Sequence, residues 1–238
     1  MLFRRLPQNT IFGLIYVLPI AVVLAVLPDT ILSRYDFTEI ASIPGAVFFI
    51  GEIAIYSIAA AAITFFTLQN LNGESPSLAA AFQTGILGML PVYGGMLAYY
   101  LGVGIGFALI VIPGIYFMTT YILVTPAIIS EDRGVSAAFS RSKALVIGYR
   151  WKVLFAVLLV AFLYMVVQFL GLSVFGLMHL VVDTGPLSIA EANAAIPATN
   201  AIGAPMSVFS VIFVAALYDE IRRVKEGTSA KDIAAIFD

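Results

Sequence analysis

The sequence predicts an all-α, polytopic membrane protein with about six transmembrane spans and with interfacial amphipathic helices. Of the 238 residues, 61% are hydrophobic and 11% are charged, whereas a soluble domain is about 45–50% apolar and about 25% charged. So few polar residues cannot cover a water-soluble fold of this size. Apolar stretches long enough to cross a bilayer recur along the chain, with short polar loops between them. We therefore expect residues 1–238 to form one helical membrane domain.

The composition also excludes several classes of function. The net charge is −2 and the cations lie at the ends of apolar stretches, so no nucleic-acid partner is expected. The absence of cysteine excludes disulfides, thiolate metal ligands and cysteine nucleophiles. Because the chain has one histidine and no motif that pairs a nucleophile with a base, the sequence predicts no metal, no cofactor and no enzyme activity.

The first two spans are expected near the N-terminus. The apolar stretch 11–27 follows Arg4 and Arg5 and has no small-x-small cleavage site, so it is predicted to be an uncleaved span. Residues 45–71 form the second span, which is long enough to cross with tilt. Glu52 lies in this span at a depth of about 12 Å, at ~1.5 Å per residue. A carboxyl group at that depth is costly and marks a functional candidate.

A short interfacial helix is expected between the second and third spans. Ser75 can cap its start, and Pro76 suits the first helical position. Residues 77–87 are weakly amphipathic, which favours a helix along the membrane surface.

The third span, residues 88–112, carries a stripe of small residues. They recur every four positions: Gly94, Ala98, Gly102 and Gly106. Such stripes let two helix backbones approach in lipid, so this one predicts packing within the chain or, alternatively, a homodimer. A break is expected at residues 112–114. The fourth span, 115–130, is short, and it either crosses the bilayer or pairs with the third as a re-entrant hairpin.

Residues 131–152 are the most basic stretch of the chain. Wound as a helix from Gly134 to Arg150, this stretch presents one apolar face in which Ser142 is the only polar residue, flanked by Arg141, Lys143 and Arg150. This pattern predicts an interfacial helix near 134–149, with its apolar face in the acyl region and its cations at the headgroups.

The remaining spans complete the topology. Residues 151–182 form the fifth span, 183–200 a polar loop, 201–217 the sixth span and 229–237 an amphipathic helix in a tail that begins basic. With the N- and C-termini in the cytoplasm, 11 of the 12 Lys and Arg lie on the cytoplasmic side, and only Arg34 lies outside. This distribution agrees with the positive-inside rule.

Two stretches carry motifs. In the first, the motif positions are Ile112-Pro113-Gly114, Pro126, Glu131, Gly134, Ala138, Arg141-Ser142, Gly148 and Trp151. In the second, they are Leu217-Tyr218, Glu220, Arg222 and Lys225-Glu226-Gly227. Over about residues 75–227 the chain resembles a bacterial family, the membrane domain of glycerophosphoryl diester phosphodiesterases and its stand-alone relatives. It departs from the family pattern at Val224, where an arginine is usual.

The resemblance implies a membrane part without an enzyme, because two-domain members cleave phosphodiesters in a separate barrel that nothing in this chain resembles. We therefore expect a non-catalytic protein of the bacterial inner membrane, an accessory or scaffold that binds lipid or a membrane-protein partner. The alternative is a transporter or lipid-translocating protein that uses Glu52. No second broken helix matches the break at 112–114, which favours the accessory protein.

Two candidate sites follow from the polar residues. The first would bind anionic phospholipid headgroups, and its members are Arg141, Ser142, Lys143, Arg150, Lys152, Arg222 and Arg223. The second is an intramembrane polar site, formed by Glu52, Gln168 and His179.

Overall fold

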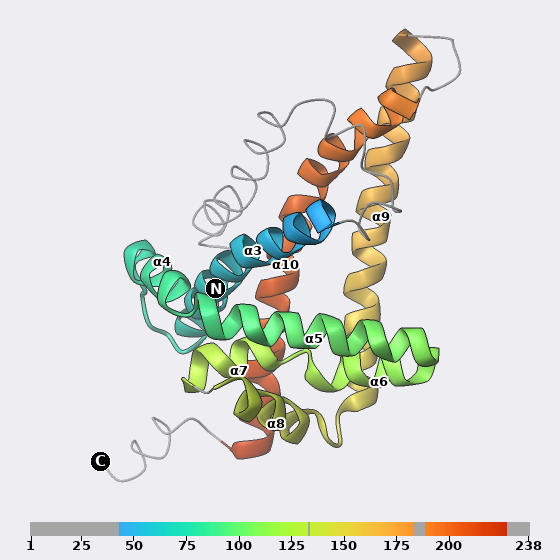
Figure 1. The fold of residues 1–238 in the computed structure, drawn as a ribbon. Helices are drawn as coiled ribbons and strands as arrows, with labels where there is room; N and C mark the ends of the chain where they lie inside the picture. The colour runs from blue at the N-terminus through green and yellow to red at the C-terminus, as the bar shows by residue number, and fades with distance from the viewer. Residues whose placement is uncertain (1–42, 133, 183–188, 228–238) are drawn as a thin grey trace.

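The computed structural model describes residues 43–132, 134–182 and 189–227, and this part of the chain is all helical (Figure 1). The helices are α3 (Ile43–Leu71), α4 (Leu78–Leu87), α5 (Met89–Leu109), α6 (Val111–Tyr121), α7 (Val124–Glu131), α8 (Val135–Val146), α9 (Arg150–Val182) and α10 (Ile189–Glu226). The predicted fold class, an all-α helical membrane protein, is confirmed.

Four stretches of the described residues are long and apolar enough to cross a membrane. They are Ile53–Leu71, Met89–Leu109, Val111–Glu131 and Arg150–Val174. The predicted first span at 11–27, Arg4, Arg5 and the tail helix at 229–237 lie outside the described residues.

The core lies where α3, α7, α8 and α10 meet. Ala60 and Phe66 of α3, Leu123 and Val146 are at most 1% exposed, and Tyr218 of α10 is fully buried among them. By contrast, α9 runs beside α10 and is almost entirely exposed along its apolar length, while α5 and α6 lie across these two helices (Figure 1). An apolar helix with so little protein contact faces lipid when the protein is in a bilayer.

The start of α4 differs from the expectation by two residues. Its N-cap is Ser77, whose side chain accepts a hydrogen bond from the backbone N–H of Ala80 at 3.1 Å. Ser75 and Pro76 therefore precede the helix. Ser77 caps the helix by accepting from the Ala80 N–H, one of the first-turn N–H groups that have no acceptor within the helix.

The predicted third and fourth spans form an antiparallel hairpin of α5 and α6. The chain turns at Ile110, whose backbone is extended, rather than at 112–114, and Pro113 lies in the first turn of α6. A proline is tolerated there because the N–H groups of the first turn have no intrahelical acceptor.

Two further boundaries correct the sequence reading. The fourth predicted span is not continuous, because the helix is interrupted at Ile122 and Leu123 between α6 and α7. The loop predicted at 183–200 is shorter than expected, since α10 already begins at Ile189 and continues through the predicted sixth span.

Candidate functional site

The apolar face of α8 packs against protein rather than lipid. Ala138, Leu145 and Val146 of this face are at most 1% exposed, and Phe139 and Tyr149 pack against the core. The expectation that this face enters the acyl region is therefore wrong. The sequence pattern of an apolar stripe is the same whether lipid or neighbouring helices cover the stripe. In this protein α6 and α7 cover it.

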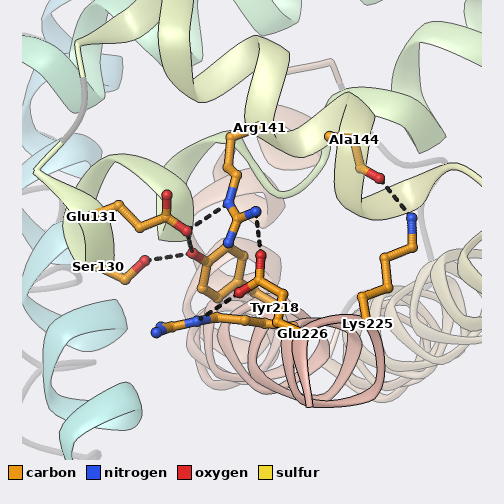
Figure 2. A network of polar contacts seen from close by, with 8 residues as sticks. Ser130, Glu131, Arg141, Ala144, Tyr218, Lys225 and Glu226 are labelled. Atoms are coloured by element: carbon orange, nitrogen blue, oxygen red, sulfur yellow. Dashed lines mark hydrogen bonds and ion pairs between the residues drawn. The ribbon is translucent and has the colours of Figure 1, made fainter. Parts of the chain in front are cut away.

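Arg141 of α8 connects its own helix to α7 and to α10 (Figure 2). Its Nε donates to Oε1 of Glu131, at the end of α7, over 2.6 Å, and its Nη1 lies 2.5 Å from Oε1 of Glu226, at the end of α10. The Arg141 and Glu131 side chains are 18% and 13% exposed, so water screens this pair only in part. The Arg141 guanidinium lowers the pKa of Glu226 below its usual value.

Tyr218 extends this network into the core. Its hydroxyl donates to Oε1 of Glu131 over 2.6 Å and accepts from the hydroxyl of Ser130 over 2.7 Å (Figure 2). Burial, together with the bond to Glu131, raises the pKa of Tyr218 to about 12. Both effects favour the neutral phenol, because a phenolate would lose solvation and would be repelled by the carboxylate.

The raised pKa of Tyr218 predicts an alkaline loss of stability. Below pH 10.0 the Tyr218 hydroxyl is protonated in both the folded and the unfolded chain. Between pH 10.0 and about 12 it is protonated only in the folded chain, so the free energy of unfolding falls as the pH rises through this window. We expect the melting temperature to fall more steeply across it in the wild type than in Tyr218→Phe, as measured by circular dichroism in detergent. Equal slopes would contradict the assignment.

The cations of the α10 end also have partners within the chain. Arg222 lies 3.5 Å from Oε2 of Glu226, and Arg223 pairs with Asp219 over 2.8 Å and donates to the Leu71 carbonyl. Lys225, which the sequence reading did not place in the site, donates to the carbonyls of Ala144 and Ile147 at 2.6 Å each. These carbonyls lie at the C-terminal end of α8, so Lys225 caps that helix although it is far from it in the sequence.

Ser142 is fully buried and donates to the Thr120 carbonyl at the end of α6 over 2.8 Å. It is therefore unavailable to a headgroup, which corrects its place among the binding residues. The bond gives the Arg-Ser pair a structural role, since Arg141 joins α8 to α7 and α10 while Ser142 joins α8 to α6.

Arg150, Lys152 and Lys225 lie around the turn from α8 into α9, where Gly148 adopts a positive φ of 91°. The Arg150 guanidinium lies 4.8 Å from the Tyr116 ring centre and donates to its hydroxyl over 3.3 Å. Lys152 and Lys225 lie 5.3 and 5.8 Å from the Tyr149 ring centre. Among the described residues, none of these three cations pairs with a carboxylate.

We call this group the α9 patch, and define it as Arg150, Trp151, Lys152, Lys225, Tyr116 and Tyr149. Two of its features are those of a ligand site. Nε of Arg150 is buried, with no hydrogen-bond partner in the described part of the chain. Trp151 is 73% exposed between the two cations, as interfacial tryptophans are. Lys143, also predicted for this site, is exposed on α8 outside the patch.

The predicted intramembrane polar site is described only in part. Gln168 lies in α9, where its Oε1 is buried and finds no partner within the described residues. Glu52 and His179 lie in α3 and α9, and their side chains fall outside what the structure describes. The described residues contain no cluster of His, Asp or Glu that could hold a metal ion.

The helix-packing stripe contacts α6 and α8 of the same chain. A Cβ on Gly106 would lie 2.8 Å from the Gly114 Cα, and one on Gly102 would overlap the Phe117 ring. A Cβ on Gly94 would touch Val135, whereas Ala98 is exposed.

Comparison of the chain with protein-family models, curated proteins and solved structures finds no match.

Proposed function

We propose that this chain is a non-catalytic accessory protein of the bacterial inner membrane that binds an anionic phospholipid at the α9 patch. Its N- and C-termini lie in the cytoplasm, so the patch meets the inner leaflet. The observation that carries the proposal is the buried, unbonded Nε of Arg150, with no carboxylate pairing with Arg150 or Lys152 among the described residues. A donor in this state favours an acceptor from outside the chain.

The chemistry of the patch supports a phosphate group as that acceptor. A guanidinium offers several N–H donors in a planar fork that matches phosphate oxygens, and a lysine adds a point charge beside it. Each cation near an anionic leaflet contributes about 1 kcal/mol. Trp151 and the exposed apolar face of α9 support a position of this group at the boundary between headgroups and hydrocarbon.

The polar network supports the accessory part of the proposal. Arg141, Arg222 and Arg223 pair with carboxylates of the same chain, so these cations already have partners within the fold. The two motifs that carry the resemblance also lie against each other, through Arg141 with Glu226 and Lys225 with Ala144. These two contacts give Arg141, Glu226 and Lys225 a structural role, in keeping with a membrane domain that works without the phosphodiesterase barrel.

The experiment compares the lipids retained by wild type and by Arg150→Gln/Lys152→Gln. Both proteins are extracted mildly from the same membranes, and native mass spectrometry counts their bound phosphatidylglycerol and phosphatidylethanolamine. We expect the anionic preference to fall about fivefold for each cation removed. The control is Lys143→Gln, which removes an exposed cation outside the patch and leaves the preference unchanged.

Two results would contradict the proposal. An unchanged anionic preference in the double variant would remove the α9 patch as the site. A stoichiometric protein in place of lipid in the wild-type spectrum would make a membrane protein the ligand instead.

A further inference from the structure

A cavity of about 250 Å³ lies between α3, α5, the α6–α7 break and α10, and none of its described lining residues belongs to the α9 patch. Hydroxyl-bearing residues from all four sides line it: Tyr56 and Thr64 of α3, Tyr99 and Tyr100 of α5, Tyr121 and Thr125 at the break, and Ser210 of α10. The rest of the wall is apolar, with Met96, Val211 and Val214 among its members. Three of the four candidate membrane spans contribute to it.

No Asp, Glu, His, Lys or Arg is among the described residues that line this cavity. A charged headgroup inside it would lose its hydration without an opposite charge to replace it, which costs several kcal/mol. The cavity therefore selects against charged ligands, and its chemistry is opposite to that of the α9 patch.

Several lining hydroxyls have no partner within the described part of the chain. Tyr99 donates to the Met118 carbonyl and Ser210 to the Met206 carbonyl. The hydroxyls of Tyr100, Tyr121 and Thr125 make no such bond among the described residues. In a membrane there is no bulk water to satisfy these groups, so a molecule that supplies hydrogen-bonding oxygens is favoured in the cavity.

The break between α6 and α7 adds backbone polarity to the same wall. Pro126 has no N–H to donate to the Ile122 carbonyl four residues earlier, and both residues line the cavity. The wall thus combines hydroxyl groups, and a backbone carbonyl that lacks its usual helical donor, with a largely apolar surface. This combination is typical of sites for small amphipathic molecules.

We propose that this cavity binds the uncharged head of a glycerolipid of the diacylglycerol class. Its ester carbonyls accept hydrogen bonds from the Tyr and Thr hydroxyls, and its free hydroxyl can donate to a backbone carbonyl. The acyl chains stay outside the cavity, among the bilayer lipids. The site is independent of anionic headgroup binding at the α9 patch, and either can fail without the other.

The test uses photoreactive probes in nanodiscs of phosphatidylcholine that contain the full chain. One probe is a diacylglycerol with a diazirine next to the ester carbonyl of one acyl chain, and the other is the phosphatidic acid with the same chains, which differs only by its phosphate. We expect the diacylglycerol probe to label the peptides that contain residues 95–100 and 121–126, and unlabelled diacylglycerol to suppress this labelling. The phosphatidic acid probe should leave these peptides unlabelled.

The variant Tyr100→Phe/Tyr121→Phe/Thr125→Val removes three hydroxyls and keeps the apolar volume nearly constant. We expect about tenfold weaker competition by diacylglycerol in this variant. The control is Tyr164→Phe, which removes a hydroxyl from α9 outside the cavity. The single variant Tyr100→Phe serves if the triple variant does not fold, because Tyr100 is 44% exposed and tolerates the change.

Three results would overturn the proposal. Labelling that unlabelled diacylglycerol cannot suppress would mean that the cavity holds water or bulk lipid only. Equal labelling by phosphatidic acid would mean that the cavity does not discriminate charge. Equal competition in wild type and in the folded variants would mean that the hydroxyls do not bind the head.

Discussion

Arg141→Gln is expected to lower the free energy of unfolding by about 2–3 kcal/mol, because it removes the charge that Glu131 and Glu226 share. Glutamine cannot bridge both carboxylates, so α8 loses its ionic contacts with α7 and with α10. For a chain of this size the loss corresponds to a melting temperature lower by about 4–12 °C. Circular dichroism in a single detergent measures it.

The matched control is Lys143→Gln, two positions along the same helix. Lys143 is exposed, so its removal should change the free energy by less than about 0.5 kcal/mol. In a double-mutant cycle, Arg141→Gln and Glu226→Gln together should cost less than the sum of the single changes, because they share one interaction. Equal melting of Arg141→Gln and Lys143→Gln would show that the bridge does not hold the helices together.

Gly106→Leu is expected to lower the free energy of unfolding by about 3 kcal/mol. A Cβ at this position would lie 2.8 and 2.9 Å from the Cα and N atoms of Gly114, which are backbone and cannot turn aside. The hairpin of α5 and α6 would have to open to admit the side chain. The expected fall in melting temperature is about 6–12 °C.

Gly104→Leu makes the same chemical change two residues earlier in α5. Nothing lies within 4 Å of a Cβ at Gly104, and the residue is exposed, so the added side chain meets lipid. Leucine is also the better helix former, and we expect unchanged or slightly higher stability. If Gly104→Leu destabilised the protein as much as Gly106→Leu, the close approach of α5 to α6 would not explain the loss.

Local patterns were enough to predict the fold class and most helix positions. The helix at 135–146 and its apolar face follow from the 3.6-residue period, and α5 follows from length and composition. The environment of each apolar face could not be predicted, because lipid and protein select the same residues. This is why α8 was expected at the membrane surface, although its apolar face packs in the core.

The candidate site shows the same limit. The basic stretch that contains Arg141, Arg150 and Lys152 was visible in the sequence, but one of the two carboxylates that bind Arg141, that of Glu226, lies at the far end of α10. Lys225 was missed because its acceptors, the last carbonyls of α8, are adjacent only in the folded chain. Lys225 was visible in the sequence as the lysine of the closing motif. The number of residues between Lys225 and α8 does not indicate, however, that the two lie in contact.

The measurement that tests anionic lipid binding at the α9 patch most directly is the fluorescence of Trp151, the single tryptophan of the chain, which lies between Arg150 and Lys152. Wild-type protein is placed in bilayers with brominated phosphatidylglycerol or, separately, brominated phosphatidylcholine as quencher. We predict stronger quenching by the anionic lipid at equal mole fraction, with the difference shrinking as salt is added. Equal quenching by the two lipids at low salt would contradict an anionic headgroup site at the start of α9.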